Sequence, residues 1–246
     1  LFYRLGDFYE GFFEDAILFS KELGLTLTHK DGGAIGKVPM AGIPVKSVNT
    51  YLAKLLKRNY KVAVCEQMEN PKDTKGLVKR DIVKTITAGT VTELNLLEPS
   101  VNNWLCAVIR VNNIYGLAYT DISTGEFYVT KGSLDEITAE LARIKPAEVL
   151  APSKKQKIQA FQIVPDEVPD LPEQITKFYS CSKLNPESFN EERAVSLIKQ
   201  LFNVTSLEAF GFEEYKISFL AAGAVIDYIF QTQKGLFTFG FCFYRC

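Results

Sequence analysis

Three apolar runs separated by two short turn sequences constrain the fold of this chain more than any other feature. The runs cover residues 104–111, 114–121 and 126–131. The Asn-Asn pair at 112–113 is typical of a tight two-residue hairpin turn, and the Ser-Thr-Gly sequence at 123–125 is a second turn signal. Short strand-forming runs joined by turns this short predict a three-stranded antiparallel meander.

A helix and a further strand are expected directly after the meander. Ser133 and Glu136 have the spacing of a capping box, in which each side chain accepts a hydrogen bond from the other residue's backbone N–H at the start of a helix. This helix should end before Pro146, and the apolar pair at 149–150 predicts a short strand. Three antiparallel strands, a helix and another strand, followed by terminal helices, would resemble a ribonuclease-H-like fold.

The C-terminal third is expected to contain loops, then helices, then a tail. Residues 152–189 carry several prolines and little periodicity, which favours loops, whereas 191–202 and 217–234 have helical spacing. We therefore predict a ribonuclease-H-like domain at 104–235. Residues 236–246 place phenylalanine at every second position, which predicts an apolar strand without an obvious partner.

The first ninety residues predict a mixed α/β unit in which strands and helices alternate. An amphipathic helix is expected to end at Gly24, and Ser47 is the predicted N-cap of a second helix. The expected strands cover residues 1–5, 25–28, 61–67 and 81–87, and residues 29–38, with three glycines, are expected to form a flexible loop.

Composition divides the chain in the same place. Pro99 and the Asn-Asn pair at 102–103 indicate a boundary, so we predict a domain at 1–90 and a linker at 91–103. Residues 1–90 contain 14 Lys and Arg against 10 Asp and Glu, a net charge of +4, while the remainder has a net charge of −5. The first part is thus suited to a polyanionic partner, and the second has less reason to meet one.

Several classes of site find no support in the residue types present. The five cysteines are scattered and contain no C-x-x-C pair, which argues against a zinc site or a disulfide framework and favours a reducing cytosolic compartment. No apolar run has the length of a membrane span, and no G-x-x-x-x-G-K-[S/T] phosphate loop is present. Because the chain opens on Leu1 inside an expected strand, we expect a fragment of a longer protein.

The sequence Gly-Asp-Phe-Tyr-Glu at 6–10 carries the most specific chemistry. Side chains two apart on a strand share a face, so Phe8 and Glu10 should project together, with Tyr9 opposite. An aromatic wedge can enter a base step from the minor groove, and a neighbouring acid in its neutral form can donate a hydrogen bond to a base. The ordinary alternative is that Phe8 belongs to a core and Glu10 faces solvent.

This motif and the blocks after it resemble the N-terminal part of the MutS family of DNA mismatch repair proteins. The resemblance covers roughly residues 1–235 and is strongest through 131. The resemblance implies that Phe8 stacks on a mispaired base and that Glu10 hydrogen-bonds it. Further blocks in the same order are Pro39-Met40-Ala41-Gly42-Ile43-Pro44, Tyr51-Leu52-Ala53-Lys54-Leu55, Val62-Ala63-Val64-Cys65-Glu66-Gln67 and Thr87-Ala88-Gly89-Thr90-Val91.

The resemblance also assigns DNA-binding candidates in the glycine-containing segment. Lys30 and Lys37 flank glycines that let backbone amides approach a phosphate, and Met40 matches a family segment near the mismatch. The alternatives are a mobile loop for the two lysines and core packing for Met40. A second basic run consists of Lys72, Lys75, Lys79, Arg80 and Lys84. This run is either a solvated face or a contact with phosphates.

Membership of this family implies partners beyond the present residues. The implied partners are double-stranded DNA with mismatches or small loops, a MutL-type matchmaker and a second copy in a homodimer, with no membrane. The family's DNA-dependent ATPase, with its ATP and Mg²⁺, is implied far downstream, so this fragment is expected to be no enzyme and to hold no cofactor. The implied location is cytoplasmic and associated with the bacterial nucleoid, or organellar.

Two other functions remain open from the sequence. The acidic second half could be a protein-interaction module that docks a repair partner. A ribonuclease-H-like domain could instead be a metal-dependent nuclease, with Asp121 as a metal-binding acid. Because Glu126, Asp135 and Glu140 do not form a compelling pattern with it, a structural role for Asp121 is favoured.

Overall fold

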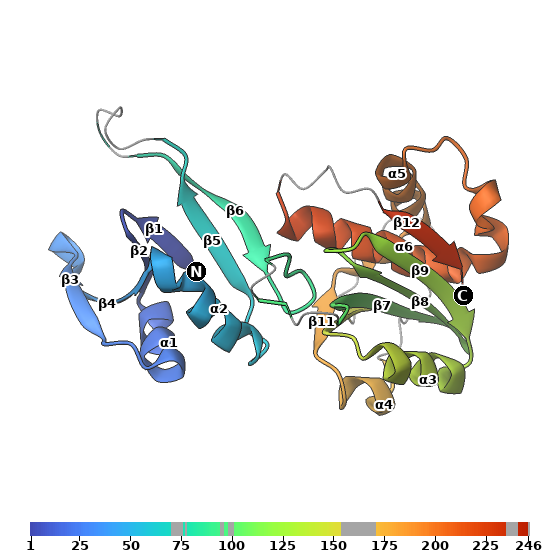
Figure 1. Ribbon diagram of the computed structural model, residues 1–246, viewed down its shortest axis with the longest axis horizontal. Helices are drawn as coiled ribbons and strands as arrows, with labels where there is room; N and C mark the ends of the chain where they lie inside the picture. The colour runs from blue at the N-terminus through green and yellow to red at the C-terminus, as the bar shows by residue number, and fades with distance from the viewer. Residues whose placement is uncertain are drawn as a thin grey trace. The chain divides into compact units, whose positions relative to one another are not determined.

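The computed structural model describes residues 1–69, 76, 78–93, 96–97, 101–153, 171–234 and 241–245. The chain divides into two compact units, one spanning Leu1–Ala88 with Thr232–Gly235 and the other spanning Gly89–Gln231 with Leu236–Cys246. Within the described residues each unit is built on its own six-stranded sheet (Figure 1). A mixed α/β architecture with a ribonuclease-H-like second domain is therefore confirmed.

The sheet of the first unit has the strand order β3-β4-β2-β1-β5-β6. Its neighbouring strands are antiparallel except for β1 and β5, which are parallel. The strands are β1 Phe2–Leu5, β2 Phe8–Phe12, β3 Thr28–Asp31, β4 Lys37–Pro44, β5 Val62–Gln67 and β6 Arg80–Ile86. The helices are α1 Glu14–Leu23 and α2 Val48–Leu56, with the short 3-10 turns η1 Gly33–Ile35 and η2 Val45–Ser47.

Helices α1 and α2 pack against each other and against β4, on one face of this sheet. Phe19 of α1 lies edge-on to Phe2 of β1, with 5.4 Å between ring centroids. Gly11 of β2 permits this close approach, because a Cβ there would lie 2.6 Å from the Phe19 ring. The opposite face of β2 carries the exposed ring of Phe8, and we call it the open face.

The hairpin between β1 and β2 depends on one glycine. Leu5 pairs with Phe8, so Gly6 and Asp7 form a two-residue turn, and of these two only Gly6 has a positive φ, of 57°. A glycine at the first turn position matches the twist of antiparallel strands at no steric cost. The Asp7 carbonyl also accepts a hydrogen bond from the backbone N–H of Val45, at 3.0 Å, which fixes the turn against the end of β4.

Two sequence expectations for the first unit are wrong. Residues 25–28 were expected to form a strand, but β3 begins only at Thr28. Residues 29–38 were expected to form a flexible loop, but most of them form the β3–β4 hairpin, closed by η1 at Gly33–Ile35. The glycines lie in the turn of this hairpin, while the flanking residues pair. The expected C-terminus of α1 is confirmed, with Gly24 in the left-handed conformation.

The sheet of the second unit has the order β11-β10-β7-β8-β9-β12. The predicted meander is confirmed as β7, β8 and β9, and β10 then pairs in parallel with β7. The strands are β7 Trp104–Val111, β8 Ile114–Asp121, β9 Glu126–Gly132, β10 Glu148–Pro152, β11 Cys181–Leu184 and β12 Cys242–Arg245. The helices are α3 Leu134–Ile144, α4 Glu173–Thr176, α5 Glu191–Phe202 and α6 Phe212–Thr232, with η3 Pro186–Phe189 and η4 Glu208–Phe210.

Helices cover both faces of the second sheet, as Figure 1 shows. Residues of α3 and α4 form one core with one face of β7 and β8, and residues of α5 and α6 form another core with the opposite face. The predicted capping box is confirmed at the start of α3, where Ser133 and Glu136 exchange hydrogen bonds. No described helix is long and apolar enough to cross a membrane.

The remaining expectations for the second unit need correction. Residues 152–189 were expected to be loops, but their C-terminal part contains α4 and the strand β11; residues 154–170 lie outside the described residues. The tail at 236–246 was expected to be an apolar strand without an obvious partner. Its described part forms β12, which pairs in parallel with β9, Phe243 opposite Phe127. Helix α6 begins at Phe212, earlier than expected, and is kinked at Tyr215.

Candidate nucleic-acid interface

Phe8 projects from the open face of the first sheet. It is 45% exposed, whereas its neighbour Tyr9 is only 7% exposed and faces the other way. The alternation expected from the motif is thus confirmed, and it brings Phe8, Glu10 and Phe12 to one face of β2. A large exposed apolar ring on a short, paired strand is a fixed projection that can be inserted into a ligand.

Glu10 lies beside Phe8 and carries an unusual carboxylate oxygen. Its Oε2 atom is buried, yet it has no hydrogen-bond partner among the described residues. The cross-strand neighbours of Glu10 are Tyr3 on β1 and Gly42 on β4, so an aromatic side chain and a bare backbone flank the carboxyl group. An unsatisfied buried oxygen is costly, which makes this position suited to an external donor or acceptor.

Gly42 lies on β4 directly beside this pair. A Cβ at Gly42 would lie 3.4 Å from Cδ1 of Phe8 and 3.9 Å from Cγ of Glu10. The absence of a side chain there leaves the Phe8 ring room to lie over the strand. Gly42 belongs to the Pro39–Pro44 block, which therefore contributes to the site through its backbone.

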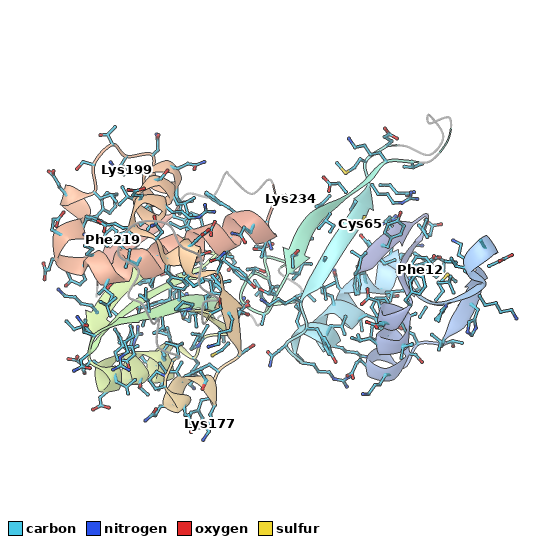
Figure 2. All side chains as sticks on the ribbon, turned by 180° about the vertical axis from the view of Figure 1, so that it is seen from behind. Phe12, Cys65, Lys177, Lys199, Phe219 and Lys234 are labelled. Carbon is cyan, nitrogen blue, oxygen red and sulfur yellow. The ribbon has the colours of Figure 1, made fainter. Side chains whose placement is uncertain are left out.

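Two cations lie over aromatic rings at or beside the open face. The Nζ of Lys30 is 5.7 Å from the centroid of the Phe12 ring, and the guanidinium of Arg80 is 5.2 Å from that of Tyr3. The two rings are themselves 6.3 Å apart and nearly perpendicular. Figure 2 marks Phe12 within the first unit. We call Tyr3, Phe8, Glu10, Phe12 and Lys30 the open-face cluster.

Of the predicted DNA-binding residues, the structure places Lys30 within this cluster and Met40 beside it, but Lys37 away from it. Lys30 is exposed on the edge strand β3, and Met40 is half-buried on β4, opposite Phe12. Lys37 is exposed at the start of β4, where it pairs with Asp31, farther from Phe8 along the strand. In the second basic run, Arg80 is fixed by hydrogen bonds to the carbonyls of Arg4 and Val78, and Lys72 and Lys75 lie outside the described residues.

Sequence reasoning did not identify Tyr3, Phe12 or the cation–π role of Arg80. The alternation of Tyr3 and Leu5 on β1 and of Phe8, Glu10 and Phe12 on β2 is visible in the sequence. The register that places Tyr3 opposite Glu10 follows from the two-residue Gly-Asp turn, so this signal was available.

On the helix-covered side of β2, the Tyr9 hydroxyl donates a hydrogen bond to Oε1 of Glu66 on β5. Burial of the ring, followed by this bond to a carboxylate, raises the pKa of Tyr9 to about 12. The guanidinium of Arg4 lies 5.3 Å from the centroid of the same ring. Glu66 belongs to the Val62–Gln67 block, for which the sequence suggested no role.

Asp121, the candidate metal ligand for a nuclease, is 2% exposed and already engaged. Its Oδ1 accepts hydrogen bonds from the backbone N–H of Ser123 at 2.8 Å and from the Ser123 hydroxyl at 2.6 Å. Its Oδ2 accepts one from the backbone N–H of Asn103 at 2.8 Å. These bonds fix the β8–β9 turn, and across the described parts of the chain no three His, Cys, Asp or Glu side chains are grouped to hold a metal ion.

Comparison with known proteins matches both units. The family model for MutS domain I matches residues 1–95, and that for MutS domain II matches residues 103–239. The chain is 42% identical over 237 residues to the DNA mismatch repair protein MutS of Thermosynechococcus vestitus. The alignment covers 95% of this chain and 27% of that protein.

Two further relatives give the same picture. The MutS proteins of Trichormus variabilis and Syntrophomonas wolfei are 39% identical over 235 residues and 42% identical over 238 residues. Each alignment covers 95% of this chain, but only 28% and 27% of the respective relative. The chain therefore spans about a quarter of the length of the curated relatives it matches.

Proposed function

Because this chain belongs to the MutS family, we propose that its first unit recognises mispaired or unpaired bases in duplex DNA, as a part of DNA mismatch repair. Phe8 is the wedge that enters the base stack, and Glu10 hydrogen-bonds the displaced base. The observation that carries the proposal is the pairing of an exposed ring with a buried, unpartnered carboxylate oxygen on one strand face.

The energetics of base stacking explain why a phenylalanine suits this task. A mispaired base is poorly stacked and poorly paired, so unstacking it costs less than unstacking a correct pair. An aromatic ring recovers roughly 1–3 kcal/mol per stacked base and accepts any base, because every base has a π-face. Discrimination then arises from the cost of kinking the duplex, which is lowest where pairing is already weak.

Glu10 adds a polar contact that the wedge cannot supply. Its Oε2 has no partner among the described residues, so a base that donates to it, or accepts from its protonated form, removes an existing cost. On correctly paired DNA that base is not displaced, and the oxygen stays unsatisfied. Glu10 therefore favours the mismatched complex over the matched one.

The lysines of the β3–β4 hairpin supply affinity without sequence selectivity. Lys30 lies on the edge strand next to Phe12, and Lys37 and Met40 lie on β4 close by in the sequence. Phosphate contacts by such lysines fix the position of a protein on the duplex, whereas contacts to the bases determine its selectivity. We assign the two lysines to contacts with the phosphates of the DNA backbone. We assign Met40 to contacts beside the Phe8 wedge.

The experiment compares matched and single-mismatch duplexes by fluorescence anisotropy at several salt concentrations. Phe8→Ala should lower the affinity for the mismatched duplex by about tenfold or more, as loss of a stacked base predicts. Glu10→Ala should lower the ratio of mismatched to matched affinity more than it lowers affinity overall. Phe178→Ala removes a 78% exposed ring of the second unit and is the matched control. Equal losses on both duplexes would contradict the assignment.

The second unit is proposed to dock a MutL-type partner. The supporting observation is charge: residues 91–246 have a net charge of −5, which disfavours a phosphate backbone as the ligand of this part. The ATPase of the family, with its ATP and Mg²⁺, and dimerisation are proposed to reside in the remaining three quarters of the full-length protein. Retention of a MutL-type protein by residues 89–246 on a column, but not by 1–88, is the test.

A further inference from the structure

Tyr9 lies between Phe8 and Glu10 in sequence but faces away from both. Its ring is buried on the helix-covered side of the sheet, 5.8 Å from the ring of Phe2. It therefore cannot reach a base that contacts Phe8. Its hydroxyl nevertheless makes a specific bond, to a carboxylate that lies 57 residues away in the sequence. A polar bond at this point needs an explanation other than base contact.

The bond crosses a strand. Tyr9 lies on β2 opposite Arg4 of β1, and Tyr3 of β1 lies opposite Cys65 of β5, the residue before Glu66. Cys65 is labelled in Figure 2. The Tyr9 hydroxyl thus reaches over β1 to the Glu66 carboxylate, and the Arg4 guanidinium lies 5.3 Å from the centre of the ring between them. The bond joins β2 directly to a strand with which it does not pair.

A tether at Tyr9 acts on the two residues beside it. Successive side chains of a strand project to opposite faces, so rotation of the strand about its own axis moves residues 8, 9 and 10 together. With the Tyr9 hydroxyl bonded to β5, that rotation would break a hydrogen bond to a charged acceptor, which is one of the stronger kinds. We infer that Tyr9 and Glu66 are positioning residues that set the direction in which Phe8 and Glu10 project.

This inference rests on the proposed function and deepens it. Phe8 must enter a base step at a defined angle. A small misplacement of a positioned group can lower the strength of its action by a large factor. The backbone pairing of β2 with β1 and β4 fixes its register but leaves twist adjustable. The tether removes that freedom from the side opposite the ligand, where it does not compete for space with DNA.

The chain offers a matched control for removing such a bond. Tyr119 in the second unit is also buried and donates its hydroxyl to a carboxylate, Glu140, at 2.8 Å. Tyr9→Phe and Tyr119→Phe therefore both delete a hydrogen bond from a phenol to a carboxylate, one behind the wedge and one in the other unit. The Tyr119 hydroxyl also accepts a hydrogen bond from Arg143 at 3.1 Å, so the control removes at least as much. On the Glu66 side, Glu66→Gln retains a hydrogen-bond acceptor and should preserve most of the discrimination between mismatched and matched duplexes. Glu66→Met retains only the length of the side chain and should lose this discrimination as Tyr9→Phe does.

Two measurements on the 246-residue protein decide the inference. The first is the ratio of mismatched to matched duplex affinity, which Tyr9→Phe and Glu66→Met should lower by roughly tenfold, the factor that a weaker hydrogen bond to a charged group represents. Tyr119→Phe should leave the ratio unchanged. The second is amide hydrogen exchange of the DNA-free protein, in which Tyr9→Phe should speed exchange selectively in β2.

The outcomes separate this inference from the proposed function. If Phe8→Ala lowers the ratio but Tyr9→Phe behaves as Tyr119→Phe does, the tether is overturned and the wedge stands. If Tyr9→Phe lowers both affinities equally, or leaves exchange in β2 unchanged, the bond has no positioning role. If Phe8→Ala itself leaves the ratio unchanged, the wedge assignment is overturned, and the exchange measurement alone then decides whether Tyr9 orders β2.

Discussion

Gly42 lies directly opposite Glu10 across β2 and β4, and a Cβ at Gly42 would contact the ring of Phe8 at 3.4 Å. This distance is an ordinary van der Waals contact, so one methyl group fits there, and we expect a branched side chain to press on the ring. The position therefore tests the geometry of the wedge without altering the wedge itself.

Gly42→Val is expected to displace the Phe8 ring and to lower affinity for a mismatched duplex by about tenfold, as partial loss of base stacking predicts. Gly42→Ala should bind nearly as the unsubstituted protein does. Anisotropy titrations with both variants check this, and a thermal unfolding curve for each shows whether the fold is intact. Equal affinities for the alanine and valine variants would contradict the contact with Phe8.

Gly11 faces the other side of β2, where the Phe19 ring leaves no room for a side chain. A Cβ at Gly11 would lie 2.6 to 3.0 Å from three atoms of the Phe19 ring, which is itself 2% exposed. Gly11→Ala should therefore lower the free energy of unfolding by roughly 1–3 kcal/mol, the usual cost of overpacking. Urea denaturation measures this loss. Phe19→Leu in the Gly11→Ala background should recover part of it, and no recovery would argue against a ring clash.

Phe13 connects β2 to α1 in a conformation that side chains rarely adopt. Its φ is 51° and its ψ is −122°, and its ring is 55% exposed, so little packing compensates the strain. Phe13→Gly should raise the free energy of unfolding by about 1 kcal/mol, because glycine adopts such angles without a Cβ clash. Asn59→Gly, at φ 60°, is the control and should gain less, since asparagine tolerates the left-handed region.

Asp121 is expected to contribute stability and not metal binding. Asp121→Ala deletes the acceptor of three hydrogen bonds and leaves the backbone N–H groups of Asn103 and Ser123 without it. The free energy of unfolding should fall by roughly 2 kcal/mol or more. Neither Mg²⁺ nor EDTA should shift the unfolding midpoint of the unsubstituted protein. A midpoint raised by Mg²⁺ only while Asp121 is present would instead favour the nuclease.

Local patterns account for the parts of the structure that the sequence predicted. The meander follows from apolar runs of strand length and two turn sequences. The alternation of Phe8, Tyr9 and Glu10 follows from strand geometry alone. The capping box at Ser133 needs only residues three apart. Each of these features is decided by neighbours in the chain.

The features that were not predicted depend on partners far away in sequence. The short strand β11, with the sequence Cys-Ser-Lys-Leu, has no alternating pattern and is defined by its pairing with β10. The apolar tail was expected to be a strand, but its partner β9 could not be inferred from composition. The bond from Tyr9 to Glu66 spans 57 residues, so the sequence displays both residues without indicating that they meet.

The raised pKa of Tyr9 gives the first unit a defined response to alkali. Burial and the bond to Glu66 raise the pKa of the phenol from 10.0 in the unfolded chain to about 12 in the folded one. A raised pKa means that the folded state retains a proton that the unfolded state has already lost. The associated stability is therefore complete below pH 10 and is lost as the pH rises from about 10 to about 12.

Tyr9→Phe should abolish this component of the pH dependence. Urea unfolding of the two proteins at pH 9 and at pH 11.5 should show a free energy of unfolding that falls more steeply for the unsubstituted chain. The pKa values of Tyr179 and Tyr244 are also raised, but both tyrosines are present in both proteins, so the difference isolates Tyr9. Absorbance at the tyrosinate band should show one fewer late-titrating phenol in the variant. An equal fall in the free energy of unfolding of the two proteins between pH 9 and pH 11.5 would mean that the Tyr9 hydroxyl is exposed to solvent and that no bond to Glu66 forms in solution.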